Sequence, residues 1–326
     1  MATYKEIFGT NIEVVSSDPS NPVEGQIWYN TSTNRVKGFL NSSGSWATGG
    51  ALNTARMNLA GTGTQTAGLA IGGESPPERA QTEAYNGTAW TEVNDLNLAR
   101  QQLAAAGIQT SALAFGGLSP PGINNETELW NGTNWTEVNN LNTARKALAG
   151  AGASNTAALA FGGNQDPPST SNLTENWNGS NWTAVNTLNT ARSLLAGAGI
   201  NTAALAFGGL DPQESEHTEL WNGSNWTEVN DLNTNRKSLA GCGTTTAALA
   251  FGGGADGDAP RLNATESWNG TNWTTVASMG TGRYDLAGAG TQAAGLSFGG
   301  RPPGNPGSAA TEEFNSGPAT VTFDVS

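Results

Sequence analysis

Hydrophobic and polar positions along this chain recur with one long period. A tryptophan returns every 44 to 47 residues, and an arginine follows each of these tryptophans ten residues later. The positions are Trp46, Trp90, Trp135, Trp182, Trp226 and Trp273, followed by Arg56, Arg100, Arg145, Arg192, Arg236 and Arg283. Such a fixed period indicates a tandem array of one supersecondary unit. Function must therefore be sought in the differences between the copies.

Each copy predicts four short strands. In the copy that begins at Arg145, small and apolar residues fill residues 148–152 and 156–161, and β-type residues fill 174–177 and 182–185. Short runs of this kind, separated by turn residues, are typical of strands. The small residues place the first two strands near a crowded axis, since bulky side chains would clash there. Four strands with this period are typical of a propeller blade, and the fold class is all-β.

An Asn-Gly pair lies between the third and fourth predicted strands. It always follows an aromatic residue and precedes the periodic tryptophan; the aromatics are Tyr85, Trp130, Trp177, Trp221 and Trp268. Asn-Gly between strands predicts a hairpin with a type I′ turn, because both central residues of that turn need positive φ. The two aromatic residues are expected to pack across the turn.

The whole unit resembles the kelch repeat. The shared features are an arginine before the first strand, a glycine pair after the second, an aromatic on the third and a tryptophan before the fourth. The glycine pairs begin at Gly72, Gly116, Gly162, Gly208, Gly252 and Gly299. The resemblance implies a kelch-like β-propeller. It implies no particular activity, because one fold carries many functions.

Seven blades are favoured over six. Counting back 44 residues from Arg56 reaches Ile12, so residues 12–51, which include Trp46, are expected to form a degenerate first blade. The propeller would then span residues 12–326. In the alternative, a six-bladed body carries a separate N-terminal attachment piece.

Residues 1–11 lie outside the repeat and are expected to form a docking arm. Apolar side chains in such an arm would face water unless a partner buries them. The residues expected to dock are Tyr4, Ile7 and Phe8.

The loop between the second and third strands varies most in length. From the second glycine of each pair to the next tryptophan the distance ranges from 17 to 20 residues. Alternating strand direction places all of these loops on one face, which we expect to be the recognition surface. The alternative is solvent-exposed loops without a selected role. The candidate recognition residues are Glu74, Glu78, Arg79, Asp166, Asp211, Glu214, Glu216, His217, Asp256, Asp258 and Arg301.

A glutamate recurs once per copy in the third predicted strand. Because an unpaired buried charge is costly, we expect these glutamates to pair with the periodic arginines on the loop-bearing face. The alternative is an exposed ring of arginines that is open to an anionic ligand. The glutamates are Glu83, Glu128, Glu175, Glu219, Glu266 and Glu312.

Charge and composition narrow the function classes. The chain has 27 acidic and 14 basic residues, a net charge of −13. Nucleic acid and membrane are therefore not expected as partners, because both are bound through clustered Lys and Arg. One histidine and one cysteine are too few for a redox metal centre or a catalytic constellation. No enzyme, cofactor or metal is expected; Asp256 and Asp258 alone offer too few oxygen ligands for Ca²⁺.

A second resemblance lies near the N-terminus. Pro22, Glu24-Gly25-Gln26 and Trp28-Tyr29-Asn30 are similar to the openings of tail-fibre and other virion proteins of tailed bacteriophages, particularly cyanophages. The similar stretch spans residues 17–30 and continues through 33–39.

This resemblance implies a non-enzymatic structural protein of the virion. It would be displayed as a tail fibre, an appendage or a capsid decoration, and it would assemble in the bacterial cytoplasm, where disulfides are rare. The implied partners are other virion proteins, in an oligomeric or multi-copy arrangement, with a host surface glycan or protein facing the loops. The alternative is a bacterial carbohydrate-binding or adhesion propeller.

Overall fold

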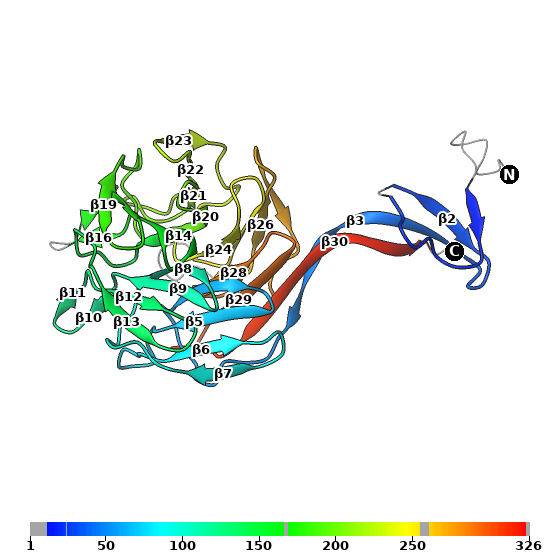
Figure 1. The fold of residues 1–326 in the computed structure, drawn as a ribbon. Helices are drawn as coiled ribbons and strands as arrows, with labels where there is room; N and C mark the ends of the chain where they lie inside the picture. The colour runs from blue at the N-terminus through cyan, green and yellow to red at the C-terminus, as the bar shows by residue number, and fades with distance from the viewer. Residues whose placement is uncertain (1–11, 24, 166–168, 255–260, 324–326) are drawn as a thin grey trace. The chain divides into compact units, whose positions relative to one another are not determined.

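Every regular element in the described part of the chain is a β-strand. The computed structural model describes residues 12–23, 25–165, 169–254 and 261–323 (Figure 1). The chain divides into two compact units. The larger unit, residues 45–315, is the propeller, and the smaller unit consists of residues 1–44 and 316–326. The prediction of an all-β fold is confirmed.

Five consecutive copies of the repeat each form one four-stranded antiparallel sheet. From the innermost strand outward, the first two blades are β4 (Ala60–Thr64), β5 (Ala67–Ile71), β6 (Thr82–Tyr85) and β7 (Trp90–Val93), then β8 (Ala104–Ile108), β9 (Ser111–Phe115), β12 (Thr127–Trp130) and β13 (Trp135–Val138). The next three are β14 (Ala149–Ser154), β15 (Ala157–Phe161), β18 (Thr174–Trp177) and β19 (Trp182–Val185); β20 (Ala196–Ile200), β21 (Ala203–Phe207), β22 (Thr218–Trp221) and β23 (Trp226–Val229); and β24 (Ala240–Gly243), β25 (Ala248–Phe251), β26 (Thr265–Trp268) and β27 (Trp273–Val276). Two loops carry small ribbons, β10 (Leu118–Ser119) with β11 (Gly122–Ile123) and β16 (Asn164–Gln165) with β17 (Ser169–Thr170).

Both ends of the repeat array contribute to the sixth blade. Its strands are β28 (Tyr284–Gly290), β29 (Ala294–Arg301), β30 (Thr311–Phe323) and, outermost, β3 (Arg35–Thr48). The innermost strands contact one another in the order β4, β8, β14, β20, β24, β28 and back to β4. This closed order makes six blades.

The structure thus differs from the expected degenerate first blade over residues 12–51. The last copy of the repeat has no tryptophan of its own, and Trp46 on β3 supplies one. Trp46 Nε1 donates to Thr265 Oγ1 at 3.0 Å, as Trp226 Nε1 donates to Thr174 Oγ1 at 3.0 Å in a regular pair of blades. Pairing between the two ends of the array closes the ring, so the alternative of six blades with an N-terminal piece matches the sheet order.

Hydrophobic packing lies between neighbouring blades. The Trp226 ring packs against Phe161 of the preceding blade, with centroids 5.0 Å apart, and against Trp221 of its own blade at 5.4 Å. Fully buried alanines such as Ala204 and Ala206 let the sheets approach closely. Each tryptophan therefore joins two blades.

The Asn-Gly turns form hairpins, but not of the predicted type. Tyr85 pairs with Trp90, which leaves a four-residue loop, and only Gly87 in it has positive φ, at 87°. Asn86 Oδ1 accepts hydrogen bonds from the backbone N–H of Thr88 and Ala89, both at 2.9 Å. The asparagine side chain stabilises the turn itself, so its backbone need not be left-handed. Packing of the flanking aromatics across the turn is confirmed by a Tyr85–Trp90 centroid distance of 4.9 Å.

The smaller unit contains β1 (Glu13–Val15), β2 (Ile27–Asn30) and the adjoining ends of β3 and β30, with β1 and β2 parallel. Asp18 is its polar centre: the carboxylate accepts from Trp28 Nε1 at 3.0 Å, Asn30 Nδ2 at 2.7 Å and Lys37 Nζ at 2.7 Å. The hydrogen bond from Lys37, followed by those from Trp28 and Asn30, lowers the pKa of Asp18 to about 2. A lowered pKa means that this cluster stabilises the fold above about pH 4 and stops doing so as the pH falls toward 2.

Candidate functional site

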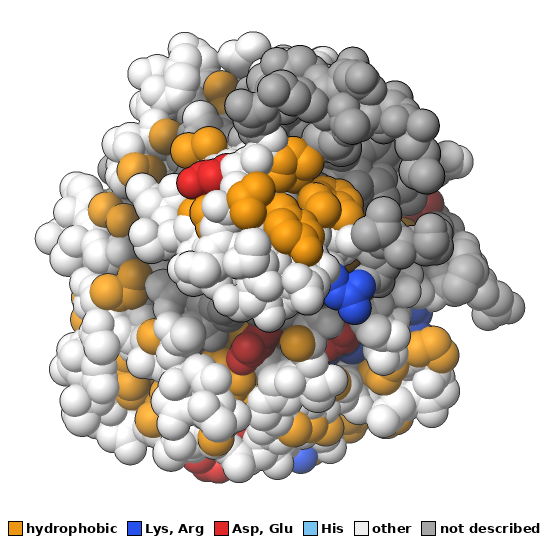
Figure 2. Space-filling model, turned by 90° about the vertical axis from the view of Figure 1, so that its right-hand side faces the viewer, with side chains coloured by type: hydrophobic (Ala, Val, Ile, Leu, Met, Phe, Trp, Pro, Cys, Tyr) orange, Lys and Arg blue, Asp and Glu red, His pale blue; other side chains and the backbone are white. Residues whose placement is uncertain are grey.

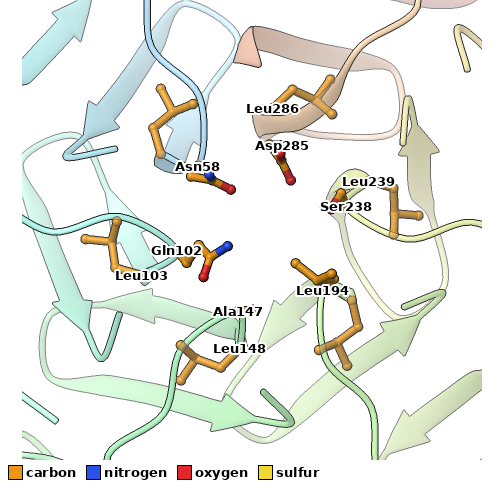
Figure 3. A pocket seen from close by; sticks show the side chains of 12 residues that line it. Asn58, Gln102, Leu103, Ala147, Leu148, Leu194, Ser238, Leu239, Asp285 and Leu286 are labelled. Carbon is orange, nitrogen blue, oxygen red and sulfur yellow. The ribbon is translucent and has the colours of Figure 1, made fainter. Parts of the chain in front are cut away.

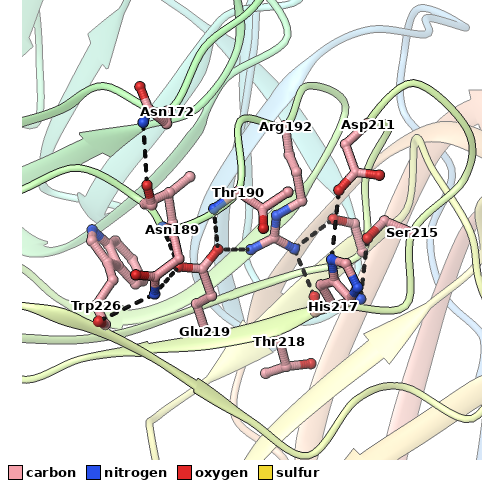
Figure 4. Close-up of polar contacts among 12 residues, drawn as sticks. Asn172, Asn189, Thr190, Arg192, Asp211, Ser215, His217, Thr218, Glu219 and Trp226 are labelled. Carbon is pink, nitrogen blue, oxygen red and sulfur yellow. Dashed lines mark hydrogen bonds and ion pairs between the residues drawn. The ribbon is translucent and has the colours of Figure 1, made fainter.

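The six periodic arginines and glutamates form six ion pairs, each within one blade. In the fourth blade Arg192 Nη2 lies 2.9 Å from Glu219 Oε1, and Arg192 Nη1 donates to the carbonyls of Gly208 and His217 (Figure 4). The second carboxylate oxygen of Glu219 accepts from the backbone and side chain of Asn189. The other pairs, at 2.7 to 2.9 Å, are Arg56–Glu83, Arg100–Glu128, Arg145–Glu175, Arg236–Glu266 and Arg283–Glu312. The predicted pairing is confirmed.

All six arginines are fully buried. Burial lowers the pKa of each guanidinium, and the paired glutamate opposes that shift. An exposed ring of arginines for an anionic ligand is therefore ruled out. Each ion pair instead connects three parts of a blade through hydrogen bonds: the carbonyl of the first glycine of the glycine pair, the glutamate on the third strand, and the asparagine or glycine in the turn between blades.

The sixth blade lacks one part of this network. In the fifth blade, the Asn233 side chain donates to Glu266 Oε2 at 2.8 Å and to the Trp273 carbonyl at 3.0 Å. The corresponding residue in the sixth blade is Gly280, whose backbone N–H alone reaches Glu312 Oε2. The Glu312 side chain is 10% exposed, against 1–2% in the other five pairs.

Gly280→Asn is expected to raise the free energy of unfolding by about 1 kcal/mol, because it restores a hydrogen bond to a charged group and removes a flexible glycine. A Cβ at this position would lie 3.1 Å from Glu312 Oε2, which a small shift of the carboxylate relieves. Urea unfolding measures the effect. Gly280→Ala is the matched control, because it changes the backbone freedom alone; an asparagine no better than alanine would contradict the missing hydrogen bond.

The variable loops lie beside the turns between blades. The residue that follows each arginine pairs with the loop that follows a glycine pair, as in the backbone bridges Met57–Glu74 and Ser193–Leu210. Loops and turns therefore share one face, as predicted. We call this the loop face; it consists of the described residues in the loops after the six glycine pairs and the turns between blades.

The predicted recognition residues form local contacts and do not make one cluster. His217 Nδ1 lies 3.5 Å from Asp211, Glu214 pairs with Lys237 at 3.2 Å, and the Arg301 guanidinium lies 5.8 Å from the Tyr284 ring centroid. Glu74, Glu78 and Arg79 are half-buried within their own loop, and Glu216 is exposed. Asp166, Asp256 and Asp258 lie outside the described residues.

A ring of six residues that the sequence analysis missed surrounds the axis on this face. Each is the second residue after a periodic arginine, and each backbone N–H donates to the carbonyl of the equivalent residue in the preceding blade at 2.8 to 3.0 Å. Around the ring they are Asn58, Gln102, Ala147, Leu194, Ser238 and Asp285. The sequence could have indicated these positions, because each is the variable third residue of the constant pattern Arg-x-x-Leu. We call this the axial ring.

All six residues of the axial ring are left-handed, with φ of 53° or 54°. This conformation costs a residue with a Cβ about 1–2 kcal/mol. Glycine occupies the other left-handed positions that recur once per blade, in the glycine pairs for example, yet the axial ring has none.

The axial ring lines a cavity of about 80 Å³. Asn58, Gln102 and Asp285 point toward its middle (Figure 3). Two further cavities, of about 120 and 160 Å³, follow along the glycine- and alanine-rich innermost strands. Burial raises the pKa of Asp285 to about 6, although a hydrogen bond from Ser238 and the positive charge of Arg301 both act to lower it. This carboxyl group therefore changes charge near pH 6.

Other site chemistry is sparse in the described ranges. His217, Glu228 and Asp231 have ligand atoms within 4.8 Å of one another, but both carboxylates are exposed and Asp231 already accepts the Thr218 N–H. They form an exposed acidic group and not a preformed cation site. The described residues contain no helix of the length and hydrophobicity needed to span a membrane.

Comparison with known proteins identifies the fold. No protein-family model matches the sequence, and no curated protein is detectably similar to it. Among solved structures, the chain is similar to that of YjhT, with a TM-score of 0.69 and 10% identity over 82% of this chain and 99% of that one. A likeness at this low identity concerns the fold alone. By fold, the protein is a β-propeller.

Proposed function

We propose that this protein is a non-enzymatic structural component of a bacteriophage virion, present on the particle as a tail fibre, appendage or capsid decoration. The smaller unit would attach the chain to other virion proteins, and the loop face would recognise the host surface. The resemblance of residues 17–39 to virion proteins of tailed phages motivates the proposal. These residues belong to the smaller unit, so we assign attachment to that unit.

The observation that carries the proposal is the division of the chain. Residues 45–315 contain the first five blades, β28, β29 and the parts of β30 and β3 that complete the sixth blade, including Trp46, whereas the remaining parts of β3 and β30 belong to the smaller unit. Residues of the segment that resembles virion proteins stabilise that unit. Trp28 is fully buried, and Trp28 and Asn30 both donate hydrogen bonds to Asp18. A compact unit in addition to the ring of six blades is suited to attachment.

Exposed apolar side chains support a partner for the smaller unit. Among the described residues, five large hydrophobic side chains are exposed, and three of them belong to this unit: Val14 (66%), Val23 (67%) and Phe323 (39%). Hydrophobic side chains are grouped on this unit in Figure 2. Grouped exposed apolar residues are typical of interaction sites, here with a virion protein or a second copy. The predicted docking residues Tyr4, Ile7 and Phe8 lie outside the described residues and stay a prediction.

The absence of enzymatic activity is part of the proposal. The six recurrent glutamates are occupied in buried ion pairs, and the axial ring offers one carboxylate, Asp285, whereas glycoside hydrolysis usually needs two. A bacterial carbohydrate-binding or adhesion propeller is the second candidate, because it would use the same loop face. This second candidate gives no role to the smaller unit or to its segment that resembles virion proteins.

Incorporation into phage particles tests the proposal. The variant Val14→Asp with Val23→Asp is expected to keep a folded propeller, checked by its melting temperature, and to be lost from purified particles. The matched control is Ile108→Asp with Ile200→Asp, because these isoleucines are 46% and 41% exposed on the propeller; this variant should incorporate normally. Equal incorporation of both variants would contradict attachment through the smaller unit, and wild-type protein found in the cell envelope and not in particles would favour the adhesion propeller.

A further inference from the structure

We infer that the axial ring binds the end of a neutral sugar through two adjacent hydroxyl groups, with a methyl or C–H face of the sugar against Ala147 and Leu194. This inference rests on the recognition role proposed above for the loop face. It adds the ligand class and the residues that contact it.

The first argument is that all six positions of the axial ring carry a side chain, although their left-handed backbone favours glycine. The ring of backbone hydrogen bonds needs no side chain, and glycine would adopt its left-handed φ without strain. Even Ala147 and Leu194, which have no polar group to favour that conformation, occupy it. Strained backbone of this kind concentrates at functional sites. The arginine and leucine that flank each ring position are constant, whereas the six ring residues are of six types.

The second argument is the order of these side chains around the axis. Four polar residues are consecutive, Ser238, Asp285, Asn58 and Gln102, and the two apolar residues follow them. The axial ring therefore has a polar arc and an apolar arc. A sugar has a comparable division, since its hydroxyl groups project from the edge of the ring and its C–H or methyl groups form apolar surface.

The third argument is hydrogen-bonding capacity. Asn58 Nδ2 donates to Gln101 Oε1 at 3.1 Å, which leaves Asn58 Oδ1 as an acceptor. Asp285 receives the Ser238 hydroxyl and keeps further acceptor sites. Gln102 directs its amide nitrogen into the cavity (Figure 3), and its buried Oε1 has no partner. Two acceptors and one donor around one point match a pair of hydroxyl groups, each of which both donates and accepts.

Size limits the ligand to an end group. At about 80 Å³ the cavity is well below the roughly 300–1,000 Å³ of sites that enclose whole ligands. The terminal residue of a surface glycan would insert its diol edge, and the rest of the glycan would lie among the loops. A 6-deoxyhexose, whose C6 is a methyl group, offers both a pair of adjacent hydroxyl groups for the polar arc and an apolar group for the apolar arc.

Titration of purified full-length protein with L-rhamnose, L-fucose, glucose and glucosamine, followed by NMR, tests the inference. A 6-deoxyhexose is expected to bind, and Asp285→Asn and Gln102→Leu should each weaken binding about tenfold or more, as loss of a hydrogen bond to a charged or buried group does. Glu137→Gln, which changes an exposed residue on the outermost strand β13, away from the axial ring, should leave the affinity unchanged.

Affinity should also depend on pH in the wild type but not in Asp285→Asn. The ionised carboxylate is the better acceptor, so binding should weaken as the pH falls below 6. The polar and charged groups around Asp285 are Ser238, Arg301, Arg261 and Glu74.

Ala147→Gly should raise the melting temperature, because glycine relieves the left-handed strain. A lower melting temperature would mean that the ring side chains are there for stability, and would overturn the inference.

Three binding outcomes would also overturn it. They are no binding of any sugar, binding that Asp285→Asn and Gln102→Leu leave unchanged, and binding of glucosamine alone, which would point to an ammonium group. Each is distinguishable from failure of the proposed function, because the presence of the protein in particles is measured separately.

Discussion

Glu219→Ala is expected to lower the free energy of unfolding by about 3–5 kcal/mol, the usual effect of removing one partner from a buried ion pair. The Arg192 guanidinium would remain fully buried without a counter-charge, and the Asn189 N–H groups would lose their acceptor. Urea unfolding followed by tryptophan fluorescence measures the loss.

The matched control is Glu228→Ala. Glu228 lies directly opposite Glu219 in the β22–β23 register, but it is exposed. Its removal should change stability by no more than about 0.5 kcal/mol. Similar losses for the two variants would contradict the role given to the buried pairs.

Trp46→Ala is expected to destabilise the propeller by about 3 kcal/mol, the lower end of the effect of truncating a buried aromatic, because Trp46 is partly buried. Its ring packs against Phe251 at 5.2 Å and Phe314 at 5.3 Å, so its loss would weaken the contact that closes the ring. Thermal unfolding measures the effect, and limited proteolysis should show earlier cleavage in β3.

Trp226→Ala is the comparison, because it removes the same contact between two consecutive blades. We expect a loss of stability at least as large, because Trp226 is more deeply buried than Trp46; its partner Thr174 is 52 residues away in sequence, whereas Trp46 is 219 residues from Thr265. An unchanged melting temperature for Trp46→Ala would show that β3 does not close the sixth blade. A chain of residues 45–315 should fold, whereas one that begins after Trp46 should not close.

Much of the propeller could be predicted because its signals are local and repeated. The Arg192–Glu219 type of pair recurs in all six copies and the Asn-Gly hairpin in five of them, so the copies support the same interpretation. The turn type was wrong because the Asn86 side chain, and not its backbone conformation, satisfies the turn. The candidate loop residues were placed on the correct face, but their contacts with neighbours such as Lys237 depend on loop conformations that the repeat does not encode.

The sequence by itself determined the blade: its four strands, its buried Arg–Glu pair and the tryptophan that joins it to the next copy. These features arise from residues within one period or between adjacent periods. The number of blades, the place of Trp46 and the axial ring were decided only by the tertiary structure. The physical reason is that ring closure and the axis depend on all six copies at once: Asp285 meets Asn58 only because β28 returns to β4, and no single copy of the repeat contains that contact.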